Sequence, residues 1–190
     1  MITSIWGDSI AFGVGDKEAL GWPGRIRRAY AVDDDRHVYN FAVCGETSSD
    51  LLKRFEIECT AIEPDRVVFA IGINDARKLD GNESAVSLED FKQNIERLIT
   101  LAEKCADDIV LIGITSVGGE FRTSHGSIFS DSDSLRYNEA LRQIAEQRGT
   151  TFINVFDVLD TSKDISDGVH PNTQGYQKLF EAISSQLNII

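Results

Sequence analysis

Residues 4–9 read Ser4-Ile5-Trp6-Gly7-Asp8-Ser9 and close an apolar run that begins at Ile2. The run stops abruptly at Gly-Asp-Ser, which predicts a buried strand that ends in a turn, with Ser9 just beyond the strand. In open α/β sheets, ligands bind in the crevice outside the carboxyl ends of the strands. A serine in that place can be a nucleophile. Because Ser is also a favoured helix N-cap, the rest of the chain must decide between the two interpretations.

Segments that read as strands alternate with segments that read as helices along the whole chain. The run Arg66–Ile71 is almost continuously apolar and rich in β-branched residues, which is typical of a strand buried on both faces of a parallel sheet. The expected strands are residues 2–6, 37–43, 66–71, 108–114 and 151–156, and the expected helices are residues 23–30, about 48–59, 88–105, 131–147 and 173–187. We therefore predict an α/β fold of three layers (α/β/α), with a five-stranded parallel sheet in the flavodoxin-like order 2-1-3-4-5.

The 190 residues suit one domain over residues 1–190, and no linker or repeat divides them. With 19 Lys and Arg against 31 Asp and Glu, the net charge of −12 disfavours nucleic acid and anionic membranes as partners. The first residues lack the basic and apolar regions of a signal peptide, and no apolar run is long enough to span a membrane. We therefore expect a cytoplasmic protein, although a leader already removed would leave no trace.

Three cysteines, Cys44, Cys59 and Cys105, occur without any CxxC pair. An odd number with this spacing argues against both a disulfide framework and a zinc site, so free thiols are expected. The three histidines are equally scattered and show no ligand spacing such as HExxH. We expect that the protein needs neither a metal nor another cofactor.

In a parallel sheet, the carboxyl ends of all strands lie at one edge. Four short motifs follow expected strands: Ser9, Gly45, Gly72–Asn74 and Asp167–His170. They are therefore predicted to converge on one site. This convergence gives weight to motifs that are each weak alone.

A serine hydroxyl needs a base before it can act as a nucleophile. His37 begins a strand at the opposite edge of the sheet, whereas His170 follows the last strand. Asp167 precedes His170 by three residues, so one tight turn can place the carboxylate against Nδ1 and fix the tautomer of the ring. Ser9, Asp167 and His170 are our candidate catalytic residues. His125, in an irregular segment, remains an alternative base, and Asp164 is a reserve partner for His170.

Acyl transfer also needs hydrogen-bond donors aimed at the developing oxyanion. The amide of Asn74, the backbone N–H of Gly45 and the N–H of Ser9 itself are the candidate donors. Taken singly, Gly45 and Asn74 read equally well as turn or cap residues. Asp8 and Asp75 are interpreted as structural residues that shape the strand-end turns.

The four motifs together resemble the blocks of the SGNH hydrolases, also called the GDSL esterase/lipase family. The resemblance runs from residue 7 to residue 170 in family order, and the matching segments are Gly7-Asp8-Ser9, Gly45, Gly72–Asp75 and Asp167–His170. It implies a flavodoxin-like sheet, a nucleophile at Ser9, oxyanion donors at Gly45 and Asn74, and a cofactor-free mechanism. It further implies His170 as the base and Asp167 as its partner. Because specificity loops vary in this family, the resemblance does not imply a substrate.

The segment 115–130 shows no clear period and is longer than most connections, so it is a candidate rim or lid. Its Phe121 and Phe129 are expected at the substrate rim. The function predicted from the whole sequence is a serine esterase that acts on small ester substrates, with short-acyl or acetyl esters favoured. Alternatives are a lysophospholipase or thioesterase for medium acyl chains, a non-catalytic flavodoxin-like ligand-binding module, and a catalytically silent interaction domain.

Overall fold

The computed structural model describes residues 1–31, 35–79 and 83–187. Its main sheet has five parallel strands in the order β2-β1-β3-β6-β9, which is 2-1-3-4-5 when the strands of this sheet are counted along the chain. The predicted fold class and strand order are therefore confirmed. The strands are β1 (Ile2–Gly7), β2 (His37–Asn40), β3 (Arg66–Ala70), β6 (Asp108–Ile112) and β9 (Thr151–Ile153).

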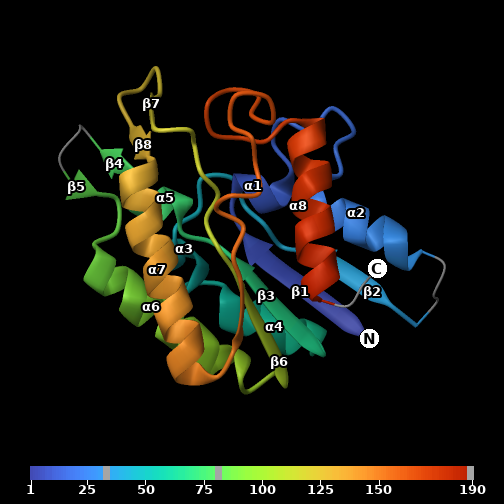
Figure 1. Ribbon diagram of the computed structural model, residues 1–190. Helices are drawn as coiled ribbons and strands as arrows, with labels where there is room; N and C mark the ends of the chain where they lie inside the picture. The colour runs from blue at the N-terminus through green and yellow to red at the C-terminus, as the bar shows by residue number, and fades with distance from the viewer. Residues whose placement is uncertain (32–34, 80–82, 188–190) are drawn as a thin grey trace.

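Helices cover both faces of this sheet (Figure 1). One face carries α1 (Ser9–Phe12), α2 (Gly21–Tyr30) and α8 (Thr173–Gln186), with α2 packed along α8. The other carries α3 (Ser48–Leu51), α4 (Phe55–Ile62), α6 (Leu88–Ala102) and α7 (Asp131–Arg148), with α6 packed along α7. The short α5 (Ile73–Ala76) follows β3. Among the described residues, no helix is long and apolar enough to cross a membrane.

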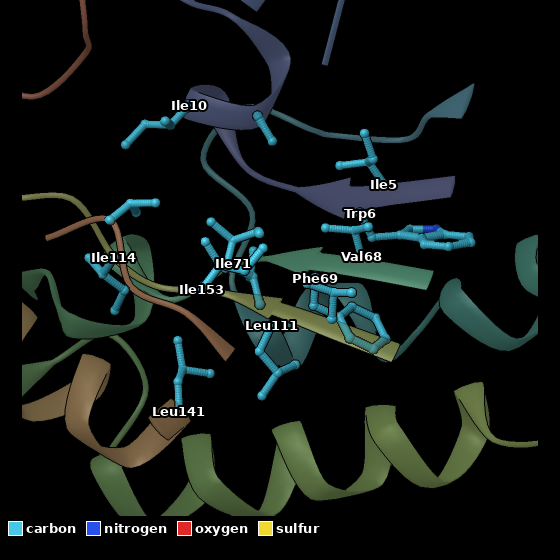
Figure 2. Close-up of a cluster of buried hydrophobic side chains, with 14 of the residues drawn as sticks. Ile5, Trp6, Ile10, Val68, Phe69, Ile71, Leu111, Ile114, Leu141 and Ile153 are labelled. Carbon is cyan, nitrogen blue, oxygen red and sulfur yellow. The ribbon is translucent and has the colours of Figure 1, made fainter. Parts of the chain in front are cut away.

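The core lies on both sides of the central strands. Val67, Val68 and Phe69 of β3 are all essentially inaccessible to solvent, so successive side chains bury on opposite faces as the apolar run predicts. Figure 2 shows this arrangement around Phe69 and Leu111, with side chains above and below the strands. A rigid central sheet of this kind fixes where its strand ends point.

Three strands end two or more residues earlier than their apolar runs suggested. The second strand stops at Asn40 rather than at residue 43. The Asn40 amide donates to the carbonyl of Ala11, and its oxygen accepts from the N–H of Ala42, so the side chain turns the backbone out of regular strand geometry. The fourth and fifth strands likewise end at Ile112 and Ile153, before the residues that turn toward the site.

Helix starts follow local capping chemistry. Ser87 caps α6, because its hydroxyl oxygen accepts from the N–H of Asp90. Ser48 and Ser49, although serine is a favoured cap, lie inside α3. Thr47 caps α3 in a reciprocal capping box with Asp50, and the expected helix breaks before α4 begins at Phe55.

The segment 115–130 contains a hairpin that sequence periodicity did not reveal. Strands β7 (Glu120–Arg122) and β8 (Ile128–Ser130) pair with each other, and β8 also pairs with β4 (Lys78–Leu79). With β5 (Glu83–Ser84) they form a second, antiparallel sheet in the order β5-β4-β8-β7. Strands of two or three residues are too short to show a period, and their partners come from a distant segment.

Phe129 lies in β8 and is only 8% exposed within the main apolar core. Replacing Phe129 with Ala is therefore expected to destabilise the protein by about 3–5 kcal/mol, because a buried ring is lost and a cavity remains. Urea unfolding would measure this loss. A change below about 1 kcal/mol would show that Phe129 is not part of a packed core.

Candidate active site

Ser9 lies at the junction of β1 and α1. The carboxylate of Asp8 accepts a hydrogen bond from the N–H of Ile10 and thereby caps α1, so Ser9 is the first residue of the helix and not its cap. Ser9 is buried and only 8% exposed. The alternative interpretation of Ser9 as a mere N-cap is therefore wrong, since Asp8 has that role.

An unbroken chain of hydrogen bonds joins Ser9 to His170 and Asp167. His170 Nε2 lies 2.8 Å from the Ser9 hydroxyl, and His170 Nδ1 lies 2.7 Å from Asp167 Oδ2. The other oxygen of Asp167 accepts from the backbone N–H groups of Val169 and His170. Burial alone would raise the pKa of Asp167, but the hydrogen bonds from His170 and Val169 hold it below its ordinary value. The carboxylate is thus ionised and oriented toward the ring.

The other candidates for base and partner lie elsewhere. His37 is at the amino end of β2, where its backbone N–H donates to the carbonyl of Met1. His125 is exposed in the β7–β8 turn beside Ser124. Asp164 is buried, but it accepts from the N–H of Asp160 and from Lys178 instead of from His170. In this structure, only Asp167 among the predicted partners hydrogen-bonds to the His170 ring.

Gly45 and Asn74 come from the ends of β2 and β3. Gly45 adopts a positive φ of 80°, which favours glycine, and a Cβ built there would meet nothing within 4 Å. The space beside the Gly45 Cα is therefore open. The buried Asn74 amide donates one N–H to the carbonyl of Glu46, 3.1 Å away, and the amide has a second N–H to offer.

Asp8 and Asp75 are buried carboxyl groups beside these residues. Burial, with smaller contributions from Asp75 and Glu46, raises the pKa of Asp8 to about 7. Burial likewise raises the pKa of Asp75 to about 6, although Asp75 accepts from the N–H and the hydroxyl of Ser48. Asp75 thus ties the end of β3 to the start of α3, in agreement with its predicted structural role.

Replacing Asp8 with Asn is expected to flatten the pH dependence of stability. Between pH 3.8, the ordinary aspartate pKa, and about 7, the folded protein keeps a proton on Asp8 that the unfolded chain has released. The stabilisation is complete below pH 3.8 and is lost as the pH rises to about 7, a difference on the order of 4 kcal/mol. Asn caps a helix as well as Asp does but does not titrate.

The measurement for this prediction is the free energy of unfolding in urea at intervals from pH 4 to pH 8. Asp8→Asn should be more stable than the wild type at pH 8 and should lose less stability across the range. Replacing the exposed Asp157 with Asn is the matched control. This variant should show the same change of unfolding free energy with pH as the wild type. If the unfolding free energy of Asp8→Asn falls with pH as steeply as that of the wild type, Asp8 is not protonated in the folded protein.

The β7–β8 hairpin contacts the turn that carries Asp167 and His170. A Cβ built on Gly168 would lie 2.3 Å from the ring of Phe121, and Gly168 has a φ of 98°. Phe121 is half-buried and packs on this turn, whereas Phe129 points into the core. Of the two predicted rim residues, Phe121 is therefore the one in contact with the candidate site.

A buried ion pair connects the loop after α1 with α2 and α8. The Arg25 guanidinium bonds to Asp16, and Arg25 also donates to the carbonyl of Thr173 at the start of α8. The Tyr176 hydroxyl donates to the carbonyl of Val14 at 2.7 Å. The loop after α1 is thus tied to α8, which directly follows His170. Arg25 is therefore buried, whereas Arg27 and Arg28 of the same helix are exposed.

A small apolar cavity of about 30 Å³ lies beneath α1. Asp8 and Ile10 line it from the Ser9 side, together with Ile73 and Ile114 from other strand ends. The Thr115 hydroxyl, also in its wall, is buried without a hydrogen-bond partner among the described residues. A volume of this size holds about one water molecule or one methyl group.

Comparison with known proteins identifies the family. The model of the GDSL-like lipase/acylhydrolase family matches residues 5–178, which contain Ser9, Gly45, Asn74, Asp167 and His170. The chain belongs to this family. It is a GDSL acylhydrolase, as the sequence motifs predicted.

Individual relatives of this GDSL acylhydrolase agree with the family match. A multidomain esterase of Ruminococcus flavefaciens is 30% identical over 122 residues, which are 61% of this chain but 14% of that protein. An acetylxylan esterase of Geobacillus stearothermophilus is 26% identical over 166 residues, 79% of this chain and 71% of that protein. The crystal structure of Axe2, an acetylxylan esterase of G. stearothermophilus, superimposes with a TM-score of 0.81 and 22% identity over 98% of this chain and 93% of that one. At this identity the superposition establishes the fold.

Proposed function

We propose that this acylhydrolase is a serine esterase that forms an acyl-enzyme on Ser9. The observation that carries the proposal is the continuous hydrogen-bonded chain from the Ser9 hydroxyl through His170 to Asp167. His170 takes the proton of Ser9 as the hydroxyl attacks the ester carbonyl, and Asp167 stabilises the imidazolium that forms. His170 then protonates the leaving alcohol, and water repeats the cycle on the acyl-enzyme.

The developing oxyanion is held by the N–H groups of Ser9 and Gly45 and by the amide of Asn74. The exposed position of Gly45 and the second N–H of Asn74 support this assignment. Donors that are already in place when charge develops need no reorganisation during the reaction, and each contributes about 10²–10³ in kcat.

We propose acetyl and other short acyl groups as the preferred substrates. The likeness to an acetylxylan esterase supports acetylated sugars as the first substrates to test. The alternative of a thioesterase or lysophospholipase for medium acyl chains is favoured by the apolar ring of Phe121, which packs on the turn that carries His170.

A substrate panel tests this proposal. Acetylated xylo-oligosaccharides and p-nitrophenyl esters from acetate to decanoate should show the highest kcat/KM for acetyl esters. A maximum at eight or more carbons, or preference for an acyl thioester, would instead select the medium-chain alternative. No hydrolysis of any ester would contradict the esterase itself.

The flavodoxin-like binding module is less well supported. A phosphate-binding loop needs free backbone N–H groups. In the loop after α1, the N–H groups of Glu18, Leu20 and Gly21 already donate to Asp16. The protein purified without a bound flavin would agree with the esterase, and a yellow protein would favour the module.

Phe121 is expected to influence substrate choice. Replacing Phe121 with Ala should shift the acyl-chain preference toward longer chains, because the half-buried ring limits the space beside Gly168. The measurement is the ratio of kcat/KM for p-nitrophenyl butyrate and acetate, with unfolding monitored in parallel. An unchanged ratio together with a large loss of stability would mean that Phe121 only supports the fold.

A further inference from the structure

Arg54 makes an extended set of hydrogen bonds near the start of α4. Its Nε and Nη2 atoms donate to the two carboxylate oxygens of Glu46, at 2.6 and 2.5 Å, so the pair is bidentate. Nη2 also donates to the carbonyl of Phe41, and Nη1 donates to Glu58. Glu58 in turn accepts from the indole N–H of the buried Trp6. One guanidinium therefore connects β1, the chain after β2, and α4.

Glu46 links this set to the candidate oxyanion hole. It directly follows Gly45, and its N–H closes a turn onto the carbonyl of Val43 at 3.2 Å. Its own carbonyl accepts the hydrogen bond from the Asn74 amide. Both non-serine oxyanion donors therefore depend on where Glu46 lies.

Other contacts anchor the chain on either side of Gly45, where the Val43 N–H donates to the carbonyl of Gly7 and Ser48 donates to Asp75. Gly45 is exposed, and nothing packs within 4 Å of the position of a Cβ. The Glu46 side chain is buried, and a buried carboxylate is stable only when it is paired. The planar fork of Arg54 meets that need with a fixed geometry that a lysine cannot reproduce.

We propose that Arg54 and Glu46 are positioning residues for the oxyanion hole, and that they set the placement of the Gly45 N–H and the Asn74 amide. The inference rests on the proposed function, because it assumes that these two groups bind the oxyanion. Oxyanion donors act only when they are preorganised at about 2.7–3.1 Å from the developing charge. Loosening the pair should therefore weaken binding of the transition state more than binding of the ester.

The test compares Arg54→Ala, Arg54→Lys and Glu46→Gln with the wild type, using p-nitrophenyl acetate. Removal of an oxyanion donor lowers kcat by about 10²–10³, and displacement of a donor should lower it less. We therefore expect kcat to fall about 10- to 100-fold, with KM within about twofold of the wild-type value. Arg54→Lys should lose nearly as much as Arg54→Ala, since the bidentate geometry is lost in both. Added guanidinium ion should restore part of the activity of Arg54→Ala.

Arg148→Ala is the matched control. Arg148 also pairs with both oxygens of a glutamate, Glu103, and its side chain is 27% exposed, against 23% for Arg54. The pair joins the ends of α6 and α7, away from the site. Its loss should leave kcat unchanged.

Inhibition by phenylboronic acid separates positioning from general loosening of the fold. The boronate forms a tetrahedral adduct with a serine and presents an oxygen to the oxyanion donors. Its inhibition constant should rise in proportion to the loss of kcat/KM in the Arg54 and Glu46 variants. The pH profile should stay in place, because neither residue contacts His170.

Two results would overturn the inference. The first is folded Arg54→Ala and Glu46→Gln variants with kcat within about twofold of the wild type. The second is a fall in kcat without any change in boronate inhibition. If Arg54→Ala does not fold, the kcat and boronate inhibition of Glu46→Gln and Arg54→Lys test the inference in its place. Wild-type protein that is not labelled at Ser9 by a serine-directed phosphonate would contradict the proposed function itself, whereas a labelled Ser9 with unaffected variants would contradict this inference alone.

Discussion

Replacing Ser9 or His170 with Ala is expected to lower kcat for ester hydrolysis by on the order of 10⁶. The 2.8 Å contact between the Ser9 hydroxyl and His170 Nε2 makes the two side chains one functional unit, since neither transfers the proton alone. The double variant should therefore be little worse than either single variant. Steady-state kinetics of the two single variants and the double variant measure this directly.

The chain contains its own control for this experiment. Ser124 and His125 also form a serine–histidine contact, 3.3 Å long, but they are exposed in the β7–β8 turn. Replacing both with Ala should leave kcat unchanged. If the effects of Ser9→Ala and His170→Ala on kcat are additive in the double variant, the two residues do not act as one unit. A large loss of kcat in the control would contradict the prediction as well.

Asp167→Asn is expected to reduce kcat by about 10⁴ with little change in KM, by analogy with the serine proteases that use the same triad. An asparagine can still accept from the backbone N–H of His170, so the turn should keep its shape. Its NH₂ group would then face Nδ1 at the position that Asp167 Oδ2 now occupies. The ring would need its lone pair on Nδ1 and its proton on Nε2, and this tautomer cannot accept the proton of Ser9.

The readout is kcat and KM together with thermal unfolding. Asp164→Asn is the comparison, because Asp164 is buried and accepts from Lys178 and from a backbone N–H. It should lose stability but not four orders of magnitude of activity. A loss below about tenfold in Asp167→Asn would mean that Asp167 does not orient His170.

The main sheet and the convergence of the motifs were predictable because both depend on local patterns. The continuous apolar run of β3 marks a doubly buried strand, and the ends of parallel strands must share one edge. Asp167 and His170 are three residues apart, a distance that a single turn spans. The contact between their side chains is therefore local in sequence and could be predicted. Topology then brings Ser9 to the same place.

Contacts that depend on irregular backbone were not predictable. Arg54 reaches Glu46 because the helix expected after Ser48 breaks between α3 and α4, and no residue pattern marks that break. Arg25 sits among other arginines on α2, and only the fold of the preceding loop brings Asp16 to it. Asp16, nine residues before Arg25, was a sequence signal for this ion pair. It could be interpreted only once the loop between the two residues was known to fold back.

The proposed mechanism depends on Ser9 as the nucleophile. Reaction with a serine-directed phosphonate until hydrolysis ceases, followed by mass-spectrometric mapping of the label, tests it most directly. We expect one label per chain, on Ser9, and no labelling in the His170→Ala variant, because a serine hydroxyl without a base is a poor nucleophile. A label on Ser48, Ser116 or Ser124 with Ser9 unmodified would contradict it.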